Sequence, residues 1–127
     1  YNAFAEVDFS QYDEREGMEL IRPVGKRPMQ FITNIKNNDW LVFNNLTFKK
    51  RPTRVTLELK AVNSDAVLEI RKGSLQGDLM ALCPIRSTNG QWDKQSFQVR
   101  KLKKKEKLYF IFRNSDKELA IKNFVFE

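Results

Sequence analysis

Hydrophobic and polar residues alternate along most of this chain. In residues 54–61 every second position is apolar. The same two-residue period recurs in residues 108–113, where Leu108, Phe110 and Phe112 lie on one face and Tyr109, Ile111 and Arg113 on the other. A period of two is typical of a β-strand that turns one face toward a core. The pattern therefore indicates strands with one buried face, and no segment shows a sustained helical period.

Short apolar runs separated by turn residues predict nine strands. The runs cover residues 4–9, 17–22, 39–48, 54–61, 66–71, 78–84, 94–100, 108–113 and 119–126, and residues 11–16 can form a single helical turn. Gly, Pro, Asn and Asp gather in the connections. Many short strands at this spacing favour an all-β fold, a two-sheet antiparallel β-sandwich of the jelly-roll type. Residues 1–127 are expected to form a single domain.

The composition supports a folded, basic domain. The chain has 127 residues, of which 41% are hydrophobic, and 23 Lys and Arg against 16 Asp and Glu leave a net charge of +7. This excess favours anionic partners or simply a soluble surface. No run approaches the length of a membrane span. Cys83 is the only cysteine, so it has no disulfide partner in the chain, and its apolar surroundings predict a buried thiol.

The residue types present argue against catalysis. The absence of His excludes imidazole-based triads and His-based zinc sites. The glycines are scattered singly, so there is no phosphate-binding loop. Carboxylate pairs such as Glu6 with Asp8 or Glu58 with Glu69 lie on predicted strands, where alternation already explains them. We therefore expect that the domain is not an enzyme.

Five stretches, taken in order, resemble family 6 carbohydrate-binding modules. They are AEVDF at 5–9, IKNNDW at 35–40, LEIRKGSLQGDL at 68–79, TNGQW at 88–92 and IKNFVF at 121–126. The resemblance implies a jelly roll that binds polysaccharide and is usually joined to a glycoside hydrolase. It also implies a secreted, periplasmic or cell-surface location in bacteria. Because the chain starts at Tyr1 without a signal-peptide pattern, it is expected to be the C-terminal or an accessory module of a larger secreted enzyme.

The resemblance also implies a sugar site in which two aromatic rings hold a sugar between them. Trp92 matches the family's loop tryptophan, and its alternative role is to cap the end of the sandwich. Asn34 stands where the second ring is expected, so Phe31 becomes the candidate for that ring and Asn34 a polar contact. Trp40 matches a ring that lines a second cleft in some relatives, and it also fits a half-buried strand position.

Two further family positions differ in this chain. The sugar-binding asparagine near the C-terminus is replaced by Ala120, so Asn123 is the nearby substitute. Many relatives hold a structural calcium ion, for which Glu6 and Asp8 match the opening carboxylates. Lys122 occupies the position of the closing aspartate. Two alternatives follow: one structural calcium ion held by Glu6 and Asp8, or a salt bridge from Lys122 to Glu6 or Asp8 in place of the ion.

Three functional readings follow. The first is a module that targets an attached glycoside hydrolase to a plant or algal cell-wall polysaccharide, anionic ones included. The second is a structural domain that has lost its sugar site and packs on the catalytic domain of the parent enzyme. The third, a nucleic-acid-binding domain, is motivated by the net charge and by the lysine-rich residues 101–107, but a strand face of interleaved aromatic and basic residues is missing. We expect polysaccharide as partner and no nucleic acid.

Overall fold

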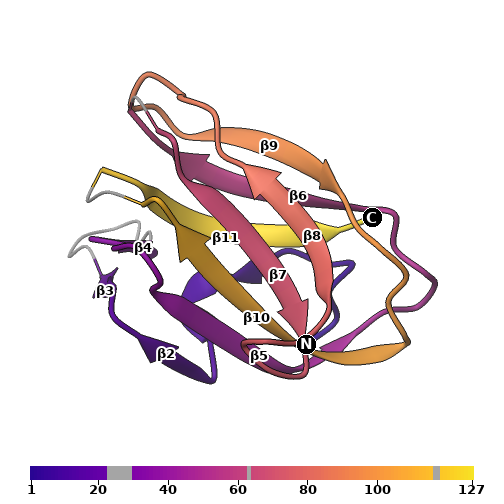
Figure 1. Cartoon of the computed structure of the whole chain (residues 1–127). Coiled ribbons are helices and arrows are strands. Elements are labelled where there is room, and N and C mark those ends of the chain that lie inside the picture. Colours follow the sequence, from indigo (N-terminus) through magenta and orange to yellow (C-terminus); the bar gives the residue numbers. More distant parts are fainter. Residues whose placement is uncertain (23–29, 63, 116–117) are drawn as a thin grey trace.

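The computed structural model describes residues 1–22, 30–62, 64–115 and 118–127, which form two packed antiparallel sheets (Figure 1). The strands are β1 (Val7–Asp8), β2 (Glu14–Glu16), β3 (Glu19–Ile21), β4 (Phe31–Thr33), β5 (Trp40–Thr47), β6 (Arg54–Lys60), β7 (Val67–Lys72), β8 (Leu79–Pro84), β9 (Asp93–Gln98), β10 (Lys105–Arg113) and β11 (Ala120–Phe126). One short 3₁₀ helix, η1, covers Phe9–Gln11.

The strand order interleaves distant parts of the chain. One sheet runs β3-β4-β11-β6-β9, with β1 also paired to β11, and the other runs β2-β5-β10-β7-β8. We call them the six-stranded and the five-stranded sheet. The first and last thirds of the chain thus lie side by side in both sheets, as the colours of Figure 1 show. The predicted all-β, two-sheet antiparallel sandwich is confirmed.

Phenylalanine rings from both sheets fill the space between them. Phe43 and Phe110 come from the five-stranded sheet, Phe124 comes from the six-stranded sheet, and all three are fully buried. The ring centroids of Phe110 and Phe124 lie 4.9 Å apart, and Phe9 contacts all three rings. These are ordinary distances for tilted and edge-to-face aromatic pairs. Val55, Leu57 and Leu59 are buried, as the alternation in residues 54–61 predicts.

The short strands near the N-terminus differ from the prediction. Residues 4–9 contribute only the two residues of β1, and the helical turn lies at Phe9–Gln11 instead of within 11–16. Two strands, β2 and β4, were not predicted, so the described residues hold eleven strands instead of nine. Both are three residues long. At that length a period of two is barely visible in a sequence, and pairing with a neighbouring strand decides the structure.

Cys83 is buried as predicted, and burial raises the pKa of its thiol to about 12. The thiol is therefore protonated and unreactive at neutral pH. In the described part of the chain, no helix has the length and apolar character needed to span a membrane.

Candidate functional site

Four side chains gather on the outer face of the six-stranded sheet. Phe31 lies in β4, Lys60 ends β6, Lys122 lies in β11, and Trp92 directly precedes β9. Because these strands are neighbours in the order β4-β11-β6-β9, their register brings the four positions together. We call this group the Trp92 cluster.

The two rings of the Trp92 cluster contact each other. The ring centroids of Phe31 and Trp92 lie 5.5 Å apart at an interplanar angle of 71°, which is an edge-to-face contact. The Nζ of Lys60 lies 5.1 Å from the Trp92 centroid, and that of Lys122 lies 5.6 Å from it. The two aromatic side chains chosen from the sequence are thus adjacent. However, direct ring contact leaves no slot between them for a sugar, and the ammonium groups interact with the indole.

Polar residues beside the cluster bond to one another. Asn123 is buried, and its Nδ2 donates a hydrogen bond of 2.8 Å to Oε1 of Glu58. Lys122 pairs with the other oxygen of the same carboxylate at 3.8 Å, so the expected pairing of Lys122 with Glu6 or Asp8 is wrong. Lys122 lies at the register shift of β11 against β6 between Ile121 and Asn123, and its ammonium lies near Glu58 of β6 and over the Trp92 ring, whereas Asp8 belongs to β1, another neighbour of β11.

Two other positions noted in the sequence lie near this end of the molecule. Ala120 is buried, and Asn34 is half-buried with a left-handed φ of 54° just after β4. Asparagine tolerates that conformation well. The positive φ gives Asn34 a structural role in the turn. Its role as a polar contact for a sugar stays a prediction.

The residues predicted to bind calcium do not form a suitable ligand set. In residues 1–22, 30–62, 64–115 and 118–127, three or more acidic, His or Cys side chains are nowhere grouped as they would be around a metal ion. Asp8 caps η1 by accepting the Ser10 N–H at 2.9 Å, and Glu6 is exposed. Calcium takes six to eight oxygen ligands, usually with several carboxylates among them. The side chains present therefore do not fit the ion.

A second group of side chains lies on the outer face of the five-stranded sheet. Glu16 of β2 is paired with Trp40 of β5, Trp40 with Ile111 of β10, and Ile111 with Glu69 of β7. Directly opposed residues of neighbouring strands project from the same face. The register therefore aligns a carboxylate, an indole, an aliphatic side chain and a second carboxylate in one row across the sheet.

The Trp40 indole is held in place by its neighbours. Its Nε1 donates a hydrogen bond of 2.9 Å to Oε2 of Glu16. Its ring lies 5.5 Å from the ring of Tyr109, at an interplanar angle of 57°. Fixed aromatic surfaces of this kind lose little conformational entropy when a ligand stacks on them. The Trp40 ring is therefore a preorganised surface on which a ligand can stack.

Charged side chains at the other end of the row form a network. Glu69 accepts hydrogen bonds from Nε of Arg71 at 3.0 Å and from Nη2 of Arg113 at 3.4 Å. Arg113 also donates to Oδ1 of Asn38 at 2.6 Å. Burial by itself raises the pKa of Glu69, but the hydrogen bonds and positive charges of the two arginines outweigh it, so the pKa lies below its ordinary value of 4.5. Glu69 is thus a carboxylate at neutral pH.

Several side chains of this face line a hollow that we call the Trp40 hollow. Its volume is about 360 Å³ and it is lined by Glu16, Asn38, Trp40, Leu75, Gln76, Ile111 and Arg113. An apolar ring stacks on the C–H face of a pyranose, while carboxylate, amide and guanidinium groups bond its hydroxyls. The lining supplies both kinds of group within a space that fits a small ligand. Sequence reasoning identified Trp40 but missed Glu16, Asn38 and Arg113, because only the strand register shows that they meet.

Comparison with known proteins assigns the family. The family described as "Carbohydrate binding module (family 6)" matches residues 10–127. The chain belongs to this family. The resemblance noted in the sequence is thereby confirmed, and the chain is a carbohydrate-binding module of a non-catalytic family. A search of curated proteins finds no match.

Solved structures share the fold at low sequence identity. A family 6 module from Clostridium cellulolyticum in complex with xylose has a TM-score of 0.88 and 19% identity, with 100% of this chain and 99% of that chain covered. A β-1,3-glucan-binding family 6 module from Bacillus halodurans has a TM-score of 0.88 and 21% identity, covering 99% and 97%. A family 43 arabinoxylan arabinofuranohydrolase from Bacillus subtilis, in complex with cellotetraose, has a TM-score of 0.87 and 20% identity, covering 98% of this chain and 27% of that one.

Proposed function

We propose that this module binds a cell-wall polysaccharide through the Trp40 hollow and thereby holds an attached glycoside hydrolase on its substrate. The observation that carries the proposal is the fixed Trp40 ring, which lines a hollow together with Glu16, Asn38 and Arg113. A sugar unit would stack on the indole and bond to the polar lining. Tethering raises the local concentration of the enzyme at the polysaccharide without any new catalytic contact.

Two comparisons support the proposed type of ligand and the proposed attachment to a glycoside hydrolase. The similar modules named above bind xylose and a β-1,3-glucan, which are neutral sugars. In the family 43 arabinofuranohydrolase the matching region covers 27% of a longer enzyme chain. By analogy, we propose xylans or β-glucans of plant or algal walls as targets, a glycoside hydrolase as the covalently linked partner, and an extracellular or cell-surface location.

The test is affinity electrophoresis of the module in gels that contain xylan, a β-1,3-glucan or a soluble cellulose. Trp40→Ala removes the platform, and burial of an aromatic side chain contributes about 1.5–3 kcal/mol. We expect an affinity loss of about ten- to hundredfold for the bound polysaccharide. Trp92→Ala is the matched control, because it removes the same side chain from the other cluster.

The two variants separate the candidate surfaces. Retained binding in Trp40→Ala together with lost binding in Trp92→Ala would place the site at the Trp92 cluster and contradict the proposal. Such a result would favour the predicted set of Trp92, Phe31, Asn34 and Asn123. Equal binding by wild type and both variants would exclude both surfaces.

The contact between Phe31 and Trp92 favours a second candidate function. A module whose inter-ring slot is closed, with two ammonium groups beside the indole, fits a structural domain that packs on its parent enzyme. In that case wild-type module shows no retardation in any of the gels. Lower thermal stability of the parent enzyme after removal of the module would then support the structural role.

A further inference from the structure

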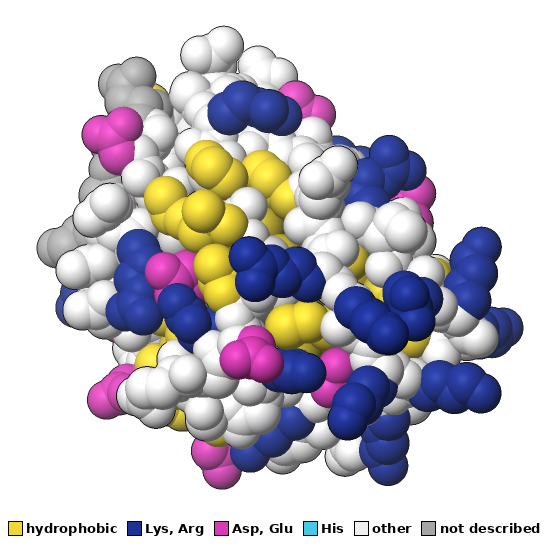
Figure 2. Space-filling model, turned by 45° about the vertical axis from the view of Figure 1, so that its right-hand side comes forward, with side chains coloured by type: hydrophobic (Ala, Val, Ile, Leu, Met, Phe, Trp, Pro, Cys, Tyr) yellow, Lys and Arg dark blue, Asp and Glu magenta, His cyan; other side chains and the backbone are white. Residues whose placement is uncertain are grey.

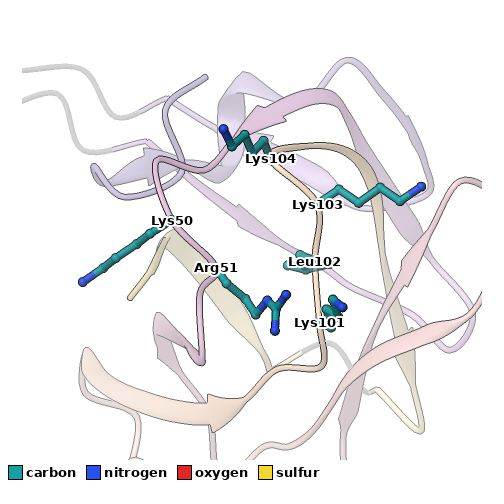
Figure 3. Close-up of a pocket in the computed structure, with 6 residues that line it drawn as sticks. All are labelled: Lys50, Arg51, Lys101, Leu102, Lys103 and Lys104. Atoms are coloured by element: carbon teal, nitrogen blue, oxygen red, sulfur yellow. The ribbon is translucent and has the colours of Figure 1, made fainter.

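A basic hollow lies apart from both aromatic clusters. Five cationic side chains, from Lys50, Arg51, Lys101, Lys103 and Lys104, surround it together with Leu102, and its volume is about 370 Å³ (Figure 3). They come from two connections, one between β5 and β6 and the other between β9 and β10. We call this surface the basic hollow.

The backbone of the basic hollow is anchored to the sandwich. The Phe48 N–H donates to the Lys104 carbonyl at 2.8 Å, and the Val99 N–H donates to the Thr53 carbonyl at 3.0 Å. The side chain of Leu102 is buried in the core between two exposed lysines. The cationic side chains therefore project from fixed positions, which lowers the entropy cost of ordering the site around a ligand.

The charges of the basic hollow are not neutralised within the described part of the chain. None of the ion pairs found there includes any of the five cationic side chains. Glu106, which is close in sequence, accepts a hydrogen bond from the Lys103 backbone N–H at 2.9 Å. Figure 2 shows Lys and Arg side chains crowded toward one side of the molecule with few acidic groups among them. Such a field concentrates anions at the surface.

The arrangement of the charges indicates the shape of the anion. In Figure 3, Lys50 and Lys103 point away from the hollow in opposite directions, whereas Arg51 extends toward the segment that carries Lys101. Charges spread in this way suit an extended chain with repeated negative groups better than a single compact anion. The planar guanidinium of an arginine binds a carboxylate with two parallel hydrogen bonds, and the ammonium group of a lysine attracts it as a point charge.

The other properties of the lining restrict the chemical class of the anionic ligand. The lining contains no aromatic side chain, so the stacking that nucleic-acid-binding grooves use is missing there. Its apolar residue, Leu102, is buried and does not project into a bilayer. We infer that the basic hollow binds an acidic polysaccharide through the carboxylates of its uronate units. The choice of a polysaccharide among polyanions rests on the family assignment and on the proposed function. The basic hollow itself is a different surface from the Trp40 hollow.

The test compares polygalacturonate with its fully methyl-esterified form, which keeps the sugar backbone and removes the charge. We expect the module to bind polygalacturonate, to bind the ester at least about tenfold more weakly, and to lose affinity as salt rises. The variant K101Q/K103Q/K104Q should lower the affinity for polygalacturonate about tenfold, since it removes three of the five positive charges of the hollow and each exposed charge pair contributes a modest share. The control K36Q/R86Q/K94Q makes the same change in net charge at exposed positions outside the hollow and should bind like wild type.

Several outcomes would overturn the inference. Equal losses in the two triple variants would show a general effect of net charge. Equal affinity for polygalacturonate and for its methyl ester would show that the carboxylates do not contribute to binding. Tighter binding to phosphatidylserine vesicles or to a single-stranded oligonucleotide than to polygalacturonate would assign the surface to another partner. The Trp40 proposal is tested on neutral polysaccharides and this inference by the difference between the acid and its ester, so failure of the one is distinguishable from failure of the other.

Discussion

Among single residues, Glu69 connects the electrostatics of the outer face to stability. It is a half-buried carboxylate that accepts hydrogen bonds from Arg71 and Arg113, and its folded-state pKa lies below 4.5. A carboxylate with a depressed pKa contributes stability that is fully present above the unfolded-state pKa. This contribution is lost as the pH falls through the lower, folded-state pKa.

We therefore predict a pH-dependent effect of Glu69→Gln. At pH 6 the variant should melt at a lower temperature than wild type, because two arginines lose their charged partner. The gap should narrow as the pH falls below 4.5 and through the lower folded-state pKa, because the wild-type carboxyl is then progressively protonated as well. Melting temperatures of both proteins across this range check the prediction, with exposed Glu14→Gln as the control. A gap that is constant with pH would contradict it.

Among the structural elements, the turn between β2 and β3 determines how Glu16 meets Trp40. Gly17 in that turn has a left-handed φ of 76°, and a Cβ at this position would collide with the Asp39 carboxylate. That carboxylate accepts the backbone N–H of Met18 at 3.1 Å and of Lys36 at 2.8 Å. One aspartate thus connects the β2–β3 turn to the start of β5, where Trp40 lies.

Gly17→Ala should destabilise the fold more than Gly73→Ala. Both glycines have positive φ, at 76° and 82°, so both changes add backbone strain of about 1–3 kcal/mol. The space around Gly73 is open, whereas Gly17 packs against Asp39. Thermal unfolding of the two variants measures the difference. A similar melting temperature for both would show that the contact with Asp39 is unimportant.

For the whole molecule, the core holds the two sheets together through aromatic packing. Phe43 and Phe110 of one sheet contact Phe124 of the other, and all are fully buried. Burying a phenylalanine contributes about 1.5–3 kcal/mol for each side chain. Stability therefore rests on burial of the sheet faces, and the carboxylates Glu6 and Asp8 do not form a ligand set that would add a metal contribution.

We accordingly predict that calcium leaves the melting temperature of the module unchanged. A ligand that binds only the folded state raises the stability in proportion to the logarithm of its concentration. Melting curves recorded after chelation and then at increasing calcium concentrations, with magnesium as the control ion, test this directly. A calcium-specific rise of several degrees that Asp8→Asn abolishes would show that Asp8 and backbone oxygens form a site after all.

The long strands were predictable because their burial pattern is local. Burial alternates over residues 54–60 as the sequence predicts, and Leu108, Phe110 and Phe112 are buried as predicted, although Ile111 between them is buried as well. Cys83 is buried as its neighbours suggest. Trp40 and Trp92 were identified as candidate site residues because they matched family positions, and Phe31 because it is the aromatic residue nearest to Asn34, which stands at the position of the family's second ring. The three-residue strands β2 and β4 escaped prediction, since only their partners β5 and β11 stabilise them.

The two-sheet sandwich and the basic surface could both be predicted before folding is considered, because the two-residue period and the charge count are properties of the linear chain. Tertiary structure decided which outward-facing side chains meet. Glu16 and Trp40 are 24 positions apart, and Asn38 and Arg113 are 75 apart, yet both pairs are hydrogen-bonded. The pairing register between distant strands sets these contacts. A side-chain period fixes the face on which a residue lies, but it does not give the residue of the partner strand that it opposes. For the same reason the family resemblance implied two rings around a sugar, whereas the folded chain brings Phe31 and Trp92 into contact with each other.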